Sequence, residues 1–318
     1  MVYQTSTLIA EDQCPLQMHQ WLPENGSTKA LMLISHGMAE HAARYDPLAQ
    51  HLNKAGYAVV ALDQRGHGQS ARGGTLGHFS DQDGWNKVTD DIALLLNKAQ
   101  ALAPGKPVFV LGHSMGSYIV QGFLLRHQPK LAGVILSGSN AHPSALSRFG
   151  RAAATLEGRL RGFDKPALGI TKLSFGQFNR AFRPARTDYD WLSRDAAQVD
   201  RYIADPLCGF ACSARLWQDL FTGLLQIADP RELQRLPKDL PVHIIGGDAD
   251  PVSAGGGLKQ LQGRLQQAGL SQVSLQLYDD ARHEILNETN RDQVLADLTE
   301  WLDAHMPNLQ TETPDVQA

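Results

Sequence analysis

The sequence predicts an α/β fold in which a mostly parallel central sheet is flanked by helices. Short apolar segments alternate with amphipathic ones along the first half of the chain, and strands that alternate with helices pair in parallel through right-handed crossovers. The apolar segments are continuous rather than alternating, which is typical of strands buried on both faces of a sheet. With 318 residues, 42% of them hydrophobic, the chain is long enough for one large domain with an insertion.

Hydrophobic patterns predict the elements of the first half. Residues 16–21 alternate between apolar and polar side chains, which predicts an antiparallel edge strand. Apolar side chains recur at three- and four-residue steps from Trp85 to Leu102, so a helix is predicted over 85–102. The other predicted strands are 31–35, 58–62, 108–111 and 131–137, and the other predicted helices are 48–55 and 115–127.

The alternation is interrupted between residues 140 and 226, where no clear strand occurs and only weakly helical stretches are found, at 195–204 and 212–225. Strands are predicted again at 242–245 and 273–278, with helices at 258–268 and 292–305. We therefore divide the chain into a core, residues 1–139 and 227–318, and a helical cap, residues 140–226. We expect the cap to cover the carboxyl edge of the sheet, where open α/β sheets bind ligands. A separate accessory domain is the alternative interpretation.

The sequence Gly-His-Ser-Met-Gly at 112–116 matches the pattern G-x-S-x-G. The pattern alone occurs often by chance. Here it follows an apolar strand and begins a helix, which is the context of the nucleophile elbow in the α/β-hydrolase fold. The elbow presents a serine hydroxyl above the edge of the sheet, so Ser114 is the predicted nucleophile.

A serine hydroxyl needs a base within hydrogen-bond reach, and the base needs an orienting carboxylate. In this fold the chain order is serine, acid, histidine. Asp248 and Asp250 both follow the strand at 242–245, and Asp250 is favoured because the chain turns away at the next residue, Pro251. His283 is the only histidine on a loop that follows a strand downstream of the acid. The predicted triad is Ser114, Asp250 and His283.

An oxyanion hole of two backbone N–H groups completes such a site. One donor is the residue after the nucleophile, Met115, and the other comes from the loop after an early strand. The turn His36-Gly37 follows the strand at 31–35, so the N–H of Met38 is the second predicted donor.

With these motifs the chain resembles the monoacylglycerol lipase and lysophospholipase-like group of α/β-hydrolases, over about residues 8–305. The resemblance rests on His-Gly-Met-Ala-Glu-His at 36–41 with Arg44-Tyr45, Asp-Gln-Arg-Gly-His-Gly-Gln-Ser at 63–70, the elbow, and Gly-Asp-Ala-Asp at 247–250. Ala39 replaces a glycine usual in the family, and alanine is small enough to keep the same backbone shape. The resemblance implies the triad and the oxyanion donors named above.

The resemblance also implies that the cap forms a hydrophobic funnel for an acyl chain. The cap supplies several large apolar side chains, most of which we expect to form its own core: Phe149, Leu156, Leu160, Phe163, Leu168, Leu173, Phe175 and Phe178.

The predicted function is hydrolysis of single-chain lipid esters, a monoacylglycerol or a lysophospholipid, and of simple esters, through an acyl-enzyme on Ser114 without a metal or organic cofactor. A peptidase, amidase, thioesterase or carbon–carbon hydrolase with the same triad is the alternative. A peptidase that binds a substrate with a free N-terminal amine needs an acidic cluster near the site. The acidic residues of the cap are explained adequately as ordinary solvent-exposed charges. A non-catalytic binding protein is disfavoured because all three triad members are present, and a dehalogenase because it would carry Asp in place of Ser114.

Composition limits the binding partners and the cellular compartment that we expect for the chain. A net charge of −4 without a basic stripe gives no support for nucleic-acid binding. The odd cysteine count (Cys14, Cys208 and Cys212) indicates a reducing compartment, and we expect small buried side chains rather than metal ligands. Residues 1–12 do not resemble a signal peptide and no apolar stretch reaches the length of a membrane span, so a cytoplasmic location is predicted. The apolar cap suggests reversible membrane contact, and oligomeric state has no sequence signal.

Overall fold

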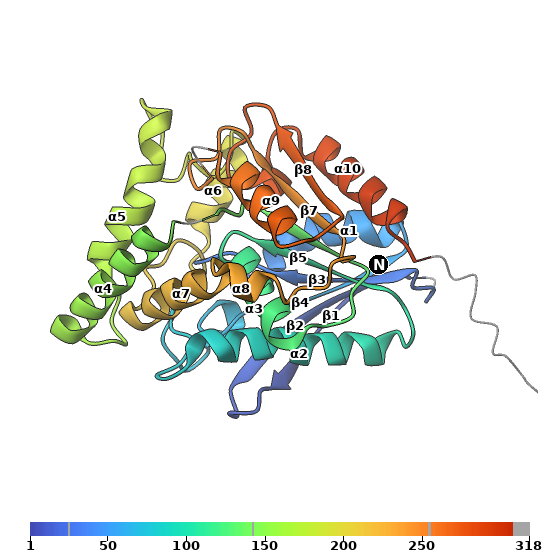
Figure 1. The fold of residues 1–318 in the computed structure, drawn as a ribbon, viewed down its shortest axis with the longest axis horizontal. Coiled ribbons are helices and arrows are strands. Elements are labelled where there is room, and N and C mark those ends of the chain that lie inside the picture. The colour runs from blue at the N-terminus through green and yellow to red at the C-terminus, as the bar shows by residue number, and fades with distance from the viewer. Residues whose placement is uncertain (25, 142, 254–255, 308–318) are drawn as a thin grey trace, which may run out of the picture.

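The computed structural model describes residues 1–24, 26–141, 143–253 and 256–307. Its strands form one sheet in the order β1-β2-β4-β3-β5-β6-β7-β8 (Figure 1). β1 pairs antiparallel with β2, β2 pairs antiparallel with β4, and all other neighbours are parallel. The strands are β1 (Val2–Ile9), β2 (Pro15–Leu22), β3 (Ala30–Ser35), β4 (Tyr57–Leu62), β5 (Val108–His113), β6 (Gly133–Ser137), β7 (Val242–Gly247) and β8 (Val273–Tyr278). The mostly parallel sheet confirms the predicted fold class.

Helices cover both faces of the sheet, and β3 shows why its sequence is apolar throughout. Leu31 and Leu33 pack into the cluster that contains α2, α3 and α9, whereas Met32 and Ile34 pack into the cluster with α1 and α10. Every residue of β3 is therefore buried. The flanking helices are α1 (Asp46–Lys54), α2 (Gly84–Leu102), α3 (Met115–His127), α9 (Gly257–Gln267) and α10 (Arg291–Ala304).

The predicted edge strand at 16–21 is wrong in its position. This segment is antiparallel, as expected, but it lies inside the sheet as β2, between β1 and β4. The true edge is β1, most of whose residues are exposed. An exposed edge strand has no continuous apolar run, which is why β1 was not predicted from the sequence.

The 140–226 segment is helical and, in the part that the structure describes, contains no strand of the sheet. Its helices α4 and α5 lie beside each other at one end of the molecule, and α7 lies between α4 and the sheet (Figure 1). The elements are α4 (Ser144–Arg161), α5 (Leu168–Phe178), the 3₁₀ turn η3 (Asn179–Phe182), α6 (Ala196–Ala204) and α7 (Ala214–Ile227). Short turns elsewhere are η1 (Ala42–Tyr45), η2 (Gly68–Ala71), α8 (Pro230–Leu233) and η4 (Ile285–Asn287).

Helix α7 joins the segment to the core. A Cβ at Gly223 would collide with the ring of Trp85 on α2, so the two helices are in close contact there. The indole Nε1 of Trp85 donates a hydrogen bond to Oε1 of Gln226 over 2.9 Å. The hydrophobic cluster of the sheet continues through α7 to Ala154 and Ile170 of the 140–226 segment. None of the helices in the described ranges is long and apolar enough to cross a membrane.

Candidate active site

Ser114 lies on a strained turn between β5 and α3. Its backbone has φ 51° and ψ −121°, a conformation that non-glycine residues rarely adopt and that costs about 1–3 kcal/mol. A Cβ at Gly112 would lie 2.5 Å from the carbonyl oxygen of Gly116, and a Cβ at Gly116 would collide with the backbone of Ser35. The two glycines of the motif are thus required by close backbone packing, and the serine is placed at the carboxyl end of β5.

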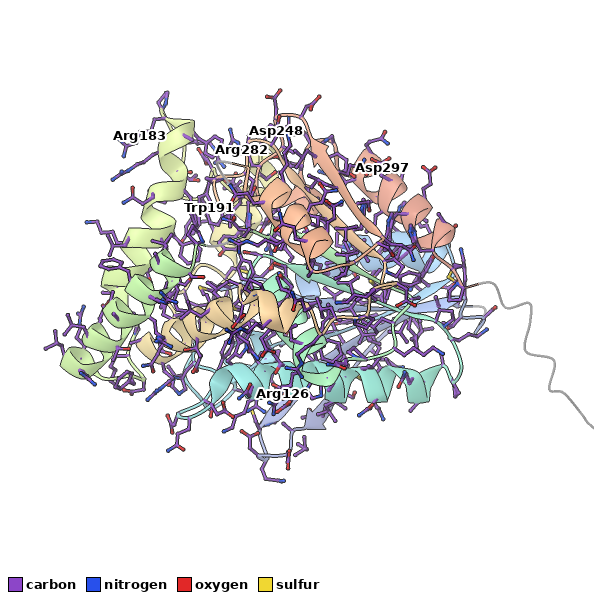
Figure 2. The ribbon with its side chains drawn as sticks, viewed as in Figure 1. Arg126, Arg183, Trp191, Asp248, Arg282 and Asp297 are labelled. Carbon is purple, nitrogen blue, oxygen red and sulfur yellow. The ribbon has the colours of Figure 1, made fainter. Side chains whose placement is uncertain are left out.

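The structure brings His283 and Asp250 together at the ends of β8 and β7. Nδ1 of His283 lies 3.0 Å from Oδ2 of Asp250, and Oδ1 of Asp250 accepts the N–H of Val252 over 2.8 Å. Both side chains are buried, at 2% and 1% exposure. Asp248, the competing acid, is exposed at the surface (Figure 2). Because Nδ1–H donates to the carboxylate, the lone pair of Nε2 is available to a proton donor.

Two rings and one glycine hold the imidazole of His283. Its centroid lies 4.8 Å from that of His113 and 5.1 Å from that of Trp191, which comes from the 140–226 segment. A Cβ at Gly138 would lie 3.0 Å from the ring of His283, so only glycine leaves room there. Burial acts to lower the pKa of His283, but the charge and hydrogen bond of Asp250 outweigh it and raise the pKa above its ordinary value. Burial, followed by the charge of His283, lowers the pKa of His113 to about 4, so His113 is neutral at pH 7.

The two predicted oxyanion donors belong to two segments that meet near Ser114. Met115 is the first residue of α3, so its N–H is one of those that have no acceptor within the helix. Met38 is on the loop after β3 and lines both of the cavities that contain Ser114. A Cβ at the neighbouring Gly37 would lie 3.3 Å from Cβ of Ser114, which shows how closely this loop approaches the serine.

A buried ion cluster, which we call the Arg44 clamp, connects the loop after β3 to the loop after β8. Arg44 donates two hydrogen bonds of 2.7 Å to Glu284 and one of 2.5 Å to Glu40. Glu40 also accepts the N–H of Gly37 over 2.5 Å and the hydroxyl of Tyr45 over 2.9 Å. The clamp therefore fixes the loop after β3, which carries Met38, relative to the residue next to His283. The charged motif is visible in the sequence, but this role is not, because Glu284 is distant in the chain.

Ala39 adopts the left-handed conformation that glycine favours, with φ 55°. Its carbonyl oxygen accepts hydrogen bonds from the hydroxyl of Tyr202 and the N–H of Gly209, both over 3.0 Å. Both donors belong to the 140–226 segment. The alanine thus has the backbone shape expected of a glycine, and two donors from this segment hold it there.

Two cavities of different size meet at Ser114. The larger has a volume of about 610 Å³ and is lined mainly by apolar side chains of α4, α5 and α7. The smaller has a volume of about 80 Å³ and is lined by many polar groups, among them Glu40, Tyr189, Tyr202 and Glu284. Met38, Ser114 and Phe175 line both. The serine therefore opens to a large apolar cavity and to a smaller one whose mainly apolar lining also carries several polar side chains.

The expectation that most large apolar side chains of the 140–226 segment form its own core is wrong, because none of the eight is fully buried. Four of them line the larger cavity: Phe149, Leu173, Phe175 and Phe178. Leu156, Leu160 and Leu168 are exposed. The buried positions of α4 are instead small residues, Ser147, Gly150, Ala154 and Gly158, because this helix packs closely against α7.

A strained serine beside a buried histidine–aspartate pair, at the carboxyl ends of parallel strands, defines a serine hydrolase of the α/β-hydrolase fold. The family model described as serine aminopeptidase, S33, matches residues 26–290, and the chain belongs to this family.

Known relatives agree with this class. The chain is 30% identical over 288 residues to the monoacylglycerol lipase of Mycolicibacterium smegmatis, covering 90% of the chain and 92% of the relative. It is 30% identical over 312 residues to the monoglyceride lipase of Homo sapiens, with 96% and 93% covered. Among solved structures, a thermostable carboxyl esterase from Bacillus coagulans in complex with glycerol superposes with a TM-score of 0.87 at 27% identity, covering 96% of the chain and 99% of the esterase.

Proposed function

We propose that the chain hydrolyses esters of single-chain lipids, with monoacylglycerol as the preferred class and lysophospholipids and simple esters as further substrates. The observation that carries this proposal is the pair of cavities that meet at Ser114. An acyl chain fits the larger apolar cavity of about 610 Å³, and a small alcohol fits the cavity of about 80 Å³, whose lining offers the polar groups of Tyr189, Tyr202 and Glu284. The names of the monoacylglycerol lipase relatives support the same substrate class.

In the proposed mechanism His283 removes the hydroxyl proton as Oγ of Ser114 attacks the ester carbonyl. The negative charge on the carbonyl oxygen is stabilised by the N–H groups of Met38 and Met115. Asp250 stabilises the imidazolium that forms. The alcohol leaves with the proton from His283, and a water molecule, activated by the same histidine, then hydrolyses the acyl-enzyme.

The charge around the small cavity favours a neutral alcohol. Glu40 and Glu284 both contact the single guanidinium of Arg44, so the cluster carries one net negative charge. A phosphate head group would be repelled there, whereas the hydroxyls of a polyol can bind to the polar lining. We therefore rank monoacylglycerols above lysophospholipids.

A peptidase remains the alternative, because the family takes its name from an aminopeptidase. Recognition of a free amine would need an unpaired carboxylate at the cavity. The two carboxylates in the lining of the small cavity are both bound to Arg44. Acids of the 140–226 segment have other partners: Asp195 caps α6 and pairs with Arg291, for example. These contacts favour an ester substrate.

The test is turnover on a matched panel, with wild type beside Ser114→Ala. The panel contains 1- and 2-monoacylglycerols, lysophosphatidylcholine, short and long p-nitrophenyl esters, and aminoacyl-prolyl anilides. We expect hydrolysis of the monoacylglycerols and of the simple esters, reduced by about 10⁴–10⁶ in the variant. Turnover of the anilides alone would show that the chain is a peptidase. Activity that survives in Ser114→Ala would show that Ser114 is not the nucleophile.

We also propose that the 140–226 segment acts as a cap that contacts an anionic lipid surface reversibly. Half of the large apolar side chains that are exposed in the described ranges lie on α4 and α5. Three of these six, Leu146, Phe149 and Leu173, also line the larger cavity, so the apolar surface is continuous with it. Exposed arginines accompany them on α4, at 148, 151, 159 and 161. Apolar side chains flanked by basic ones favour anionic membranes. The unpaired cysteines support the cytoplasmic location of this contact.

Sedimentation with vesicles tests the membrane contact. Wild type is expected to bind vesicles that contain phosphatidylglycerol more strongly than pure phosphatidylcholine vesicles. The double variant Leu156→Asp with Leu160→Asp changes exposed residues that do not line the cavity. It should lose vesicle binding and turnover of vesicle-borne monoacylglycerol, while turnover of a water-soluble ester stays unchanged. Equal binding of wild type and variant would show that this apolar surface does not bind the vesicles.

A further inference from the structure

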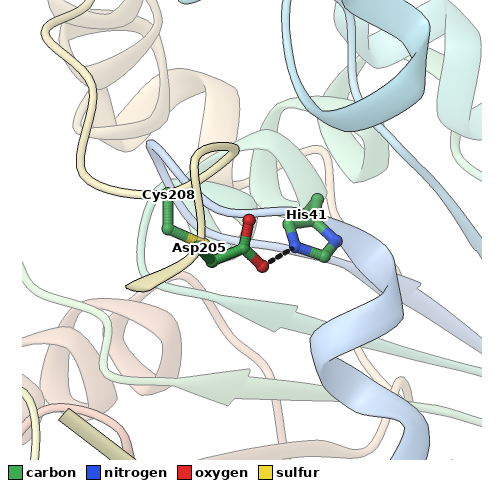
Figure 3. A group of neighbouring side chains, drawn as sticks. All are labelled: His41, Asp205 and Cys208. Atoms are coloured by element: carbon green, nitrogen blue, oxygen red, sulfur yellow. Dashed lines mark hydrogen bonds and ion pairs between the residues drawn. The ribbon is translucent and has the colours of Figure 1, made fainter. Parts of the chain in front are cut away.

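Three side chains with different donor atoms meet where the loop after β3 contacts the 140–226 segment (Figure 3). His41 directly precedes η1, and Asp205 and Cys208 lie on the turn after α6. A ring nitrogen, a carboxylate oxygen and a sulfur, one from each residue, all lie within 4.8 Å of one another. Nε2 of His41 is 2.8 Å from Oδ2 of Asp205.

The turn itself holds two of these groups in place. The N–H of Cys208 donates to the carbonyl oxygen of Asp205 over 3.0 Å, which closes a four-residue turn. The N–H of Leu207 donates to Oδ1 of Asp205 over 2.8 Å, so Oδ2 is the carboxylate oxygen that faces His41. The carboxylate is therefore already oriented toward the histidine, and the turn places the thiol beside both.

We propose that His41, Asp205 and Cys208 form a binding site for a borderline-soft divalent cation, with Zn²⁺ as the best match. Zinc takes nitrogen, oxygen and thiolate ligands in tetrahedral geometry, and three protein ligands leave the fourth position to water. Mg²⁺ and Ca²⁺ prefer oxygen ligands and fit this donor set poorly. The proposed ester hydrolysis uses none of the three side chains.

Binding should draw the two segments together. Zinc–ligand bonds are about 2.0–2.3 Å long, so ligand atoms around the ion lie about 3–4 Å apart. The present spread of up to 4.8 Å must therefore shrink by about 1 Å.

His41 is three residues from Met38, and Ala39, between them, is hydrogen bonded to the same turn through Gly209. A displacement of about 1 Å in a catalytic donor can lower activity about 10²-fold. We therefore expect Zn²⁺ to inhibit ester hydrolysis. This inhibition rests on the proposed function, whereas the binding does not.

Cobalt spectroscopy tests the site without using activity. Co²⁺ titrated into the metal-free full chain should give a thiolate-to-cobalt charge-transfer band in the near ultraviolet, at one ion per chain, and Zn²⁺ should displace it. Cys208→Ser should abolish the band, and Asp205→Asn should weaken the affinity at least about 10- to 100-fold. Cys14→Ser is the matched control, since Cys14 is far from the site in the fold and should leave the titration unchanged. Cys208→Ala replaces the serine variant if circular dichroism shows that the latter is unfolded.

Each outcome decides one part of the proposal. A charge-transfer band that persists in the Cys208 variant, or no band in wild type, overturns the site and leaves a hydrogen-bonded His41–Asp205 pair beside a thiol. Inhibition by Zn²⁺ that a chelator reverses, and that Cys208→Ser resists, supports the coupling to the oxyanion loop. Binding without inhibition overturns that coupling but not the site. If no ester is hydrolysed by the metal-free chain, the proposed function fails while the cobalt titration still decides the site.

Discussion

The central strands and the 140–226 segment use apolar side chains in opposite ways. In β3, β4 and β5 every residue is buried, and helices pack on both faces. In α4 the buried residues are small ones, and in α5 only Ile170 is buried, while larger side chains face the cavity or solvent. The core therefore holds Ser114, Asp250 and His283 by dense packing, whereas the 140–226 segment supplies an apolar wall that remains open to a ligand.

The largest expected effect is in the core, at the acid. Asp250→Asn should lower kcat about 10⁴-fold, because the amide no longer stabilises the imidazolium or selects its tautomer. The pH profile should change as well. His283 acts as base only when deprotonated, so activity is lost as pH falls through its pKa, which Asp250 holds above the ordinary value. Without Asp250 burial dominates, and the acidic limb of kcat/KM should move to lower pH.

Asp248→Asn is the control for this profile, since Asp248 is exposed. It should match wild type in both kcat and pH dependence. Loss of activity in this control, with Asp250→Asn still active, would reverse the choice of acid.

The same contrast explains what the sequence could predict. Short apolar runs between turns favour strands buried in a sheet, and the predicted strands at 31–35 and 58–62 agree with β3 and β4 to within one residue at each end. The alternating segment at 273–278 agrees with β8, which is only partly buried. The elbow could be predicted because its two glycines and the serine lie within five consecutive residues, 112–116. Phe149 and Leu173 were misjudged because periodicity reports an apolar face but not what lies opposite it.

Contacts between residues that are far apart in the chain explain the site features that were not predicted from the sequence. Arg44 and Glu284 are 240 residues apart, and His41 and Asp205 are 164 apart. No local pattern joins either pair. The expectation that the three cysteines are buried is confirmed for Cys212 but wrong for Cys14 and Cys208, which are partly exposed, and the ring of His41 lies beside Cys208.

A second prediction compares ion pairs in the two regions. Arg44→Met leaves Glu40 and Glu284 buried without a cation and should cost about 3–5 kcal/mol in the free energy of unfolding, measured in urea. In the 140–226 segment, Arg186 pairs with Asp200 over 2.6 Å, but both side chains are about half exposed, at 48% and 57%. Arg186→Met should therefore cost only about 0–1 kcal/mol. An equal loss in the free energy of unfolding for the two variants would mean that burial does not determine how much each ion pair stabilises the fold.

A third prediction concerns substrate length. Ser174 on α5 lines the larger cavity, and Ser174→Phe should fill part of it. We expect kcat/KM for long-chain esters to fall about 10- to 100-fold, because filling a hydrophobic pocket is worth roughly 1–3 kcal/mol. Short esters should change by less than about 2-fold. Lys172→Phe, exposed on the same helix and outside the cavity lining, is the matched control. An equal loss on long and short esters would mean that the 140–226 segment affects the chemistry itself.

The smallest expected effect lies at the contact between the two regions. Ala39 has φ 55°, which costs a non-glycine residue about 1–2 kcal/mol, whereas glycine adds about 0.5–1 kcal/mol of backbone entropy to the unfolded chain. Ala39→Gly should therefore raise the free energy of unfolding by about 0.5 kcal/mol. Ala43→Gly, in η1 and without a positive φ, should lower it by about 0.5–1 kcal/mol.

If both variants are destabilising to the same degree, the alanine is not strained and the loop adopts this shape by itself. If Ala39→Gly is stabilising, the left-handed shape is imposed on the loop by its surroundings. The groups that hold it are the hydroxyl of Tyr202 and the N–H of Gly209, both in the 140–226 segment. In that case the segment does more than line a cavity. It also sets the backbone of the loop after β3, and Tyr202→Phe should then reduce the stability gained by Ala39→Gly.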